Sequence, residues 1–200
     1  MNELIVANVK KYANMLAEKK YLQSGYIAVR EEDGIVITRP RINYSDVKEE
    51  NLTFVNDKNI ETLEGNFRAA AVILFCAIRQ DKEANAAAIV DSDSTVEFSK
   101  KRKTLMPILD DMAQVCGVSI KCSQKNVASD VVAALSGQRN CCLLPEAGAA
   151  CVFDVLCDFL FLVGDDCGRF FFFLFLFTAL GSLLLFLVGF GIFEFEYDVF

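Results

Sequence analysis

The residues best suited to chemistry lie in the segment AAAIVDSDSTVEF, at positions 86–98. An apolar, strand-like run leads there into four alternating acidic and hydroxyl residues: Asp91, Ser92, Asp93 and Ser94. Their oxygens could bind a hard cation such as magnesium, although the glycine and distal glutamate of a calcium loop are missing. They could equally form a solvated connection, because Asp and Ser are favoured N-caps of a following helix.

Two arginines and eight cysteines are the other candidates. Arg39 and Arg41 flank a proline, and they could either clamp a small anion or form a solvated turn. The cysteines include no C-x-x-C pair and lie mostly in apolar runs, which does not favour zinc. Adjacent Cys141 and Cys142 should face opposite sides of a strand. Because the first twenty residues are too polar for a secretory leader, we expect a cytoplasmic domain with mostly reduced, buried thiols.

The composition argues against several classes of function. Asp and Glu (27) outnumber Lys and Arg (20), so the chain is acidic and has no basic stripe for nucleic acid. The basic run at 100–103 is expected to complement a helix end instead. The chain has no histidine, which is the commonest metal ligand and general base near neutral pH. Any chemistry would therefore depend on carboxylates, thiols, amines, phenols or backbone groups.

The segments that must position these residues alternate between helical and strand patterns. YIAVR and GIVIT flank an Asp-Gly turn, which predicts a β-hairpin over 26–38. Apolar periodicity predicts helices over 3–20, 67–80, 94–101 and 128–136. Apolar runs predict strands over 85–90, 118–121 and 141–144. Strands that alternate with helices favour an α/β domain over a helical bundle.

Three segments together resemble the class II aldolase and adducin family. SGYIAVREEDGIVITRPRINYSDVKEENLTFVNDKN is similar to the opening of that family, which reads SGN-I-S-V-R, then I-T-P-S-G, then Y-D-x-L-x-P-E-D. NAAAIVDSDSTVEFSKKRKTLMPILDDMAQVCG matches N-A-V-x-H-T-H-S-x-x-A-x-x-x-S-x-x-x-K-x-L-x-P-x-x-D-E-M-A-Q without a gap, and LSGQRNCCLLPEAGAACV resembles a segment ending L-L-R-N-H-G-x-x-V. The resemblance covers about residues 1–152. It implies a three-layer α/β domain with a central, mostly antiparallel sheet flanked by helices.

The resemblance also implies an activity and an assembly. Active members of the family bind a divalent metal, usually zinc, through three histidines, and they cleave or epimerise small sugar phosphates. A carboxylate of an S-S-E segment assists proton transfer, and the SGN, TPSG and SSE backbones hold phosphate. Members are typically tetramers with sites at subunit boundaries, which implies a homo-oligomer here.

This chain carries other residues at the matching positions. The metal-binding histidines are replaced by Ile89, Asp91 and Ala147, and the catalytic glutamate by Ala70. At the phosphate segments Tyr26 replaces the asparagine of SGN, and TPSG reads Thr38-Arg39-Pro40-Arg41. A single carboxylate cannot replace three imidazoles, so we expect no zinc and no other cofactor.

The sequence changes character at Phe153. Residues 153–200 hold 14 of the 18 phenylalanines and no lysine, and 170–193 carry no charge, which is long enough to span a bilayer. Arg169 before this run and acidic residues after it would place the first domain on the cytoplasmic side. Alternatively, a reading-frame shift near residue 152 would produce such a tail in place of closing amphipathic helices.

Two hypotheses for function follow. The first is a non-catalytic (pseudoenzyme) class II aldolase or adducin-like protein with a binding or assembly role, which could attach to a membrane through its tail. The second is a diverged aldolase or epimerase-like enzyme that acts on a small sugar phosphate without the histidine site. In either case a small anionic ligand could bind near Arg39, Arg41, Asp91 and Ser92.

Overall fold

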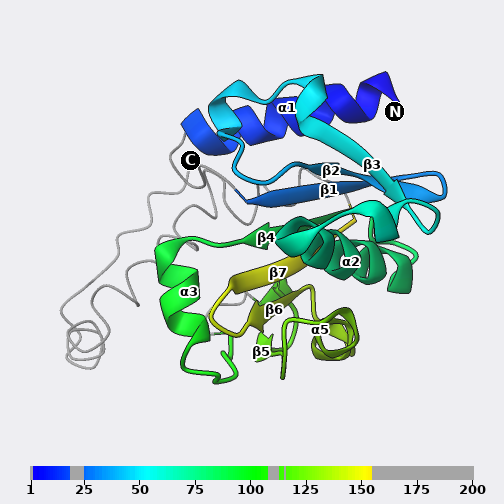
Figure 1. Cartoon of the computed structure of the whole chain (residues 1–200). Helices are drawn as coiled ribbons and strands as arrows, with labels where there is room; N and C mark the ends of the chain where they lie inside the picture. Colours follow the sequence, from blue (N-terminus) through cyan, green and yellow to red (C-terminus); the bar gives the residue numbers. More distant parts are fainter. Residues whose placement is uncertain (1, 19–24, 108–112, 115, 155–200) are drawn as a thin grey trace, which may run out of the picture.

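The computed structural model describes residues 2–18, 25–107, 113–114 and 116–154. Within these ranges the strands form one sheet of seven, in the order β3-β2-β1-β4-β7-β6-β5 (Figure 1). The helices are α1 (Glu3–Glu18), α2 (Gly65–Gln80), α3 (Asp93–Ser99) and α5 (Ala128–Leu135). The strands are β1 (Tyr26–Glu31), β2 (Gly34–Thr38), β3 (Leu52–Asn56), β4 (Ala86–Val90), β5 (Lys121–Cys122), β6 (Cys141–Leu144) and β7 (Gly148–Phe153).

The domain has three layers. On one face of the sheet, α1 and α3 pack over a core that includes Val9, Leu16 and Phe98. On the other face, α2 and α5 cover a second core that includes Leu74 and Val131. All the strand pairs are antiparallel except β5 with β6, which confirms the expected α/β domain with a mostly antiparallel sheet.

The central strand β4 consists of small and apolar residues, and its place in the sheet accounts for this composition. It lies between β1 and β7, and all five of its residues are buried. Ala86, Ala88 and Val90 face the α1 side, while Ala87 and Ile89 face the α2 side. Because both faces of β4 are covered by helices, its sequence is continuously apolar rather than alternating.

The predicted hairpin is confirmed, and its tight packing depends on one glycine. Strand β1 pairs with β2 from Ala28 opposite Ile37 to Glu31 opposite Gly34. A Cβ atom on Gly34 would come within 2.4 Å of the Val55 carbonyl oxygen on β3. The hairpin and β3 can therefore approach closely only because this residue has no side chain.

Two strands were not predicted, and one prediction was wrong in its bounds. Neither β3 nor β7 was expected, since LTFVN is short and GAACVF opens with small residues that show no alternation. The strand predicted over 118–121 is instead β5, at Lys121–Cys122. Before it, Ile120 makes an isolated bridge to Leu105.

The cysteines behave as expected where the structure describes them. All six described cysteines are free thiols, and four of them are buried. Cys141 lies in the core on the α1 side and Cys142 in the core on the α2 side. Adjacent thiols on opposite faces of β6 cannot share a metal ion.

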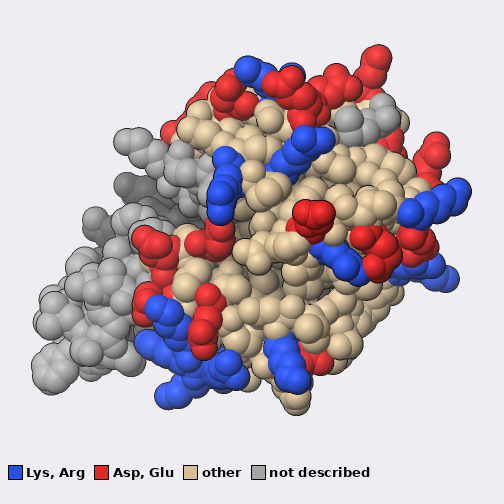
Figure 2. All heavy atoms as spheres, viewed as in Figure 1, with Lys and Arg blue, Asp and Glu red and all other residues tan. Residues whose placement is uncertain are grey.

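Charged side chains are spread over the surface. Figure 2 shows acidic and basic groups interspersed, with one gathering of basic groups near the end of α3. Part of the basic run that follows α3 is paired: Lys100 with Glu97, and Arg102 with Glu146 at 3.7 Å.

The phenylalanine-rich tail lies outside the described residues. Strand β7 ends at Phe153, one residue beyond the 1–152 range of the resemblance. The predicted membrane span at 170–193 and the alternative of a shifted reading frame both concern residues beyond 154. In the described part of the chain, every helix is too short or too polar to cross a membrane.

Candidate functional site

The residues singled out by the sequence meet at one end of the sheet. Strand β1 begins at Tyr26, opposite Ile89 near the end of β4, and Val90 pairs with Ala149 near the start of β7. Strand β2 ends at Thr38, whose hydroxyl accepts a hydrogen bond of 3.0 Å from the backbone N–H of Ile27. Antiparallel pairing thus brings the first residues of β1 and β7 beside the last residues of β2 and β4.

The three positions that resemble metal ligands are close together but differ in environment. Ile89 is only 6% exposed and belongs to the core under α2, and Ala147 packs against the same core. Asp91, just beyond β4, is exposed. The turn before β7 touches it, since a Cβ atom on Gly148 would lie 3.1 Å from the Asp91 Cα atom.

Asp91 lies in surroundings that disfavour its charge. Burial of part of the carboxyl group raises the pKa of Asp91, a hydrogen bond from its own backbone N–H opposes the rise, and the Asp93 carboxylate adds to it. Ion pairs between side chains occur elsewhere in the described part of the chain, but none involves Asp91. Asp91 could therefore stabilise a cation or hold a proton at this edge.

Two tyrosines lie beside Asp91. Tyr26 stacks on Phe67 of α2, with ring centroids 6.3 Å apart. Burial raises the pKa of the Tyr26 phenol, the Asp91 carboxylate raises it further, and Arg41 lowers it. Tyr26 thus lies within electrostatic range of both an acidic and a basic group from the candidate set.

Tyr44 is fully buried, in the short 3-10 helix Tyr44–Asp46. Among the described residues its hydroxyl has no partner with good hydrogen-bond geometry, although the Thr38 hydroxyl faces it. Burial raises the pKa of Tyr44 well above its usual value, the Thr38 hydroxyl that faces it partly opposes the rise, and Asp91 and Tyr26 add to it. Sequence reasoning missed Tyr44 as a neighbour of the site, although it lies in the Y-D-x-L segment of the resemblance.

Comparison with known proteins places the chain in a family. The sequence model described as the Class II Aldolase and Adducin N-terminal domain matches residues 9–154. The chain belongs to the class II aldolase and adducin family. No curated protein matches it in sequence.

Solved structures of class II aldolases share the fold. An L-fuculose 1-phosphate aldolase is 17% identical with a TM-score of 0.66, and the match covers 79% of each chain. YgbL, a putative aldolase/epimerase/decarboxylase from Escherichia coli, is 15% identical with a TM-score of 0.61, over 80% of this chain and 89% of YgbL. A sugar-phosphate aldolase from Thermotoga maritima is 14% identical with a TM-score of 0.57, over 77% and 86% of the two chains. At such identities the likeness concerns the fold alone.

The residues of this class II aldolase domain do not fit a zinc ion at the matching positions. Ile89 and Ala147 have no lone pair to donate, and histidine is absent from the whole sequence. Within the described ranges no three His, Cys, Asp or Glu side chains are grouped to hold a metal ion. Ala70 of α2, which the resemblance matches to the family's glutamate, is 5% exposed and packs in the core, and its methyl group cannot transfer a proton.

Ser92 serves the helix that follows it. It is the N-cap of α3, and its hydroxyl accepts a hydrogen bond of 3.4 Å from the Thr95 backbone N–H. A second contact of 2.9 Å joins the Ser92 and Thr95 hydroxyls. The capping interpretation of this segment is confirmed, since the Ser92 oxygen is already used by α3.

The two arginines of the class II aldolase phosphate segment have separate surroundings. The Arg39 Nε atom donates a hydrogen bond of 3.0 Å to the Thr53 hydroxyl on β3. Arg41 is exposed, has a φ of +61°, and lies close enough to Tyr26 to lower the pKa of that phenol. Of the pair, Arg41 is the better placed to meet an anion beside Tyr26.

Proposed function

We propose that this domain is a non-catalytic class II aldolase-like protein with a binding or assembly role. The observation that carries the proposal is the apolar filling of the metal position, where Ile89 and Ala147 pack against the core under α2. An aliphatic side chain cannot act as a Lewis base, so the zinc-dependent step has no ligand set at the matching positions. The alanine at position 70 removes the acid as well.

Zinc content and activity together test this proposal. The full-length chain, incubated with zinc and then desalted, is analysed for bound metal and assayed for cleavage of L-fuculose 1-phosphate with and without a chelator. We expect substoichiometric zinc and no chelator-sensitive cleavage. Stoichiometric zinc, or cleavage abolished by the chelator, would overturn the proposal.

A restored ligand set provides the matched variant. The triple substitution Ile89→His, Asp91→His and Ala147→His returns three imidazoles to the positions that the resemblance assigns. If these positions correspond, the variant should bind zinc stoichiometrically where the parent does not. If the triple variant fails to fold, the measurement on the parent remains decisive, because stoichiometric zinc in the parent contradicts the proposal by itself.

A second candidate is a diverged enzyme acting on a small sugar phosphate. The observation in its favour is that Asp91, Tyr26 and Arg41 remain together at the family's site end, with the pKa of Asp91 raised. Here Arg41 would bind the phosphate, and Asp91 would exchange the proton. A thermal-shift series with L-fuculose 1-phosphate and magnesium or manganese tests it. No stabilisation, with Arg41→Ala and Arg39→Ala both resembling the parent, would exclude it.

Assembly is the remaining part of the proposal. We expect the domain to form a homo-oligomer, because the resemblance implies subunits that meet near the site. Light scattering on the full-length chain measures this mass directly. Flotation of the same chain with lipid vesicles tests attachment through 170–193, and the DNA sequence of the neighbouring reading frame tests the alternative origin of the tail.

A further inference from the structure

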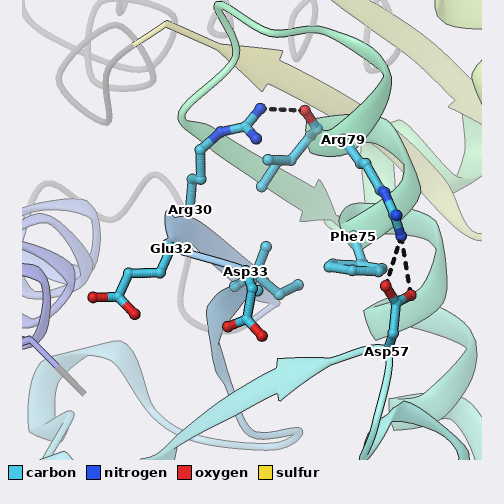
Figure 3. Close-up of a pocket in the computed structure, with 9 residues that line it drawn as sticks. Arg30, Glu32, Asp33, Asp57, Phe75 and Arg79 are labelled. Carbon is cyan, nitrogen blue, oxygen red and sulfur yellow. Dashed lines mark hydrogen bonds and ion pairs between the residues drawn. The ribbon is translucent and has the colours of Figure 1, made fainter.

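A cavity of about 240 Å³ lies at the end of the sheet opposite the candidate site. It is enclosed by the turn between β1 and β2, by Asp57 just after β3, and by the second half of α2 (Figure 3). Gly34 at this end pairs with Asn56, whereas Thr38 at the site end pairs with Leu52. The cavity is therefore separate from the family's site, on other loops.

Both basic groups that line the cavity already have hydrogen-bond acceptors, and one of them, Arg79, is also neutralised by the Asp57 carboxylate. The Arg30 guanidinium donates to the carbonyl oxygens of Ile78, Asp81 and Ala84, where α2 ends. The Arg79 guanidinium donates to both carboxylate oxygens of Asp57, at 3.0 and 2.9 Å. A guanidinium with several acceptors in place has little left to offer an incoming anion.

The acidic groups of the turn are not neutralised in this way. Glu32 and Asp33 line the cavity, and neither takes part in a salt bridge in the described part of the chain. From the residues that the structure describes, Asp33 accepts a single hydrogen bond, of 3.3 Å from the Asn56 side-chain amide. Figure 3 shows Glu32 turned toward the α1 side and Asp33 lying between Glu32 and the Phe75 ring. Asp33 is thus the free charge nearest the aromatic wall.

The rest of the wall is apolar. Phe75 is 7% exposed, and Ile35 and Ile78 are almost completely buried. The Arg79 guanidinium lies 5.6 Å from the Phe75 ring centroid, so this ring already contacts one cation. An aromatic ring beside an unpaired carboxylate is a pattern that recognises organic cations rather than anions or hydrated metal ions.

We infer that this cavity binds a small organic cation, with a primary ammonium or guanidinium group at Asp33 and a short apolar stem against Phe75 and Ile78. The size of the cavity suits a ligand of a few heavy atoms, because the cavity is smaller than the roughly 300 Å³ at which pockets for drug-sized ligands begin. The charge agrees as well: the three lining carboxylates outnumber the two guanidinium groups, and both guanidinium groups are already bound.

Three probes that share one stem test the charge. The full-length chain is titrated with n-butylammonium, n-butanol and n-butyrate while the backbone amide signal of Gly34 is followed by NMR. We expect saturable shifts with n-butylammonium alone, with a dissociation constant on the order of 1 mM. A lysine residue capped at both ends, added as a fourth probe, distinguishes a protein side chain from a free amine as the source of the cation.

Two variants and a control test the residues. Asp33→Asn removes the charge and keeps a residue of the same shape at the second position of the Glu32-Asp33 turn, where hairpins favour both Asn and Asp, so the fold is retained. It and Phe75→Leu should each weaken n-butylammonium binding by about fivefold, the loss expected for one ion pair or for part of the apolar contact between the stem and the ring. Glu50→Gln removes an exposed carboxylate at the far end of β3 and should change nothing.

The proposal is overturned if n-butylammonium gives no saturable shift, if n-butyrate binds equally well, or if Asp33→Asn binds like the parent. Asp33 lies on an exposed turn, so its variant remains decisive even if Phe75→Leu is too unstable to measure. Because the cavity shares no residue with the Asp91 end of the sheet, zinc binding or sugar-phosphate cleavage there leaves the inference unaffected.

Discussion

Gly148 lies so close to Val90 that a Cβ atom on the glycine would stand 2.0 Å from the Val90 carbonyl oxygen. Gly148 also has a φ of +105°, a conformation that other residues rarely adopt. This contact holds the turn before β7 against the end of β4, and so brings Ala147 beside Asp91. The shape of the candidate site depends on the absence of one side chain.

Gly148→Ala should therefore destabilise the domain strongly. Backbone strain and the clash together should lower the free energy of unfolding by about 3 kcal/mol or more. Urea unfolding of the full-length chain measures the loss. Gly65→Ala is the matched control: its φ is +55°, but nothing lies within 4 Å of the added Cβ atom, so only strain of about 1 kcal/mol is expected. Equal losses would contradict the close contact.

The raised pKa of Asp91 predicts a pH dependence of stability. The native state holds the Asp91 proton more tightly than the unfolded chain does, so ionisation of this group costs stability as pH rises from its ordinary pKa of 3.8 through the raised native value. Asp91→Asn is neutral throughout, so this variant should be more stable than the parent at pH 7, and the difference should shrink toward pH 4. Urea midpoints at both pH values measure it. If Glu50→Gln gives the same gain, the effect is only that of a lower net charge.

Removal of the buried Tyr44 hydroxyl and removal of the buried Thr38 hydroxyl should have different effects on stability. The Tyr44 hydroxyl finds no well-formed hydrogen bond in the described part of the chain, so Tyr44→Phe should leave stability unchanged or raise it by up to about 1 kcal/mol. The Thr38 hydroxyl accepts from the Ile27 backbone, so Thr38→Val should cost about 1–2 kcal/mol. Thermal unfolding of the two variants side by side is the measurement. A marked loss in Tyr44→Phe would show that the hydroxyl has a partner.

Arg30 should contribute more to stability than an exposed arginine. It donates to three carbonyl groups where α2 ends, a geometry that a lysine cannot reproduce. Arg30→Lys should lower the free energy of unfolding by about 2 kcal/mol, the range for hydrogen bonds to a charged group. Arg39→Lys, which loses one exposed bond to Thr53, should cost under about 0.5 kcal/mol. Similar losses from both variants would mean that Arg30 does not anchor the end of α2.

Local patterns were sufficient for much of the fold. The turn residues EEDG and the strand-like segments YIAVR and GIVIT on either side predicted β1 and β2, and the apolar periodicity predicted α1, α2 and α5 to within a few residues. The strands β3 and β7 were missed because LTFVN is short and GAACVF opens with small residues that show no alternation. Strand β7 is stabilised by pairing with β6 across a short turn and with the more distant β4, from Ala86 opposite Phe153 to Val90 opposite Ala149. Pairing of this kind leaves little trace in a six-residue window.

The sequence by itself determined the chemistry that the site can offer. It has no histidine, its resemblance to the family matches Ile89, Asp91 and Ala147 to the metal positions, and it has a serine directly after Asp91. These facts depend only on residue types. Only the tertiary structure decided which of these groups meet. Antiparallel pairing brought Tyr26 and Asp91 to one end of the sheet, and packing buried the Tyr44 hydroxyl where no residue of the described ranges makes a well-formed hydrogen bond to it. The tertiary structure also formed a cavity beside Asp33 at the other end of the sheet. The burial and ion pairing of its lining residues depend on contacts between distant segments.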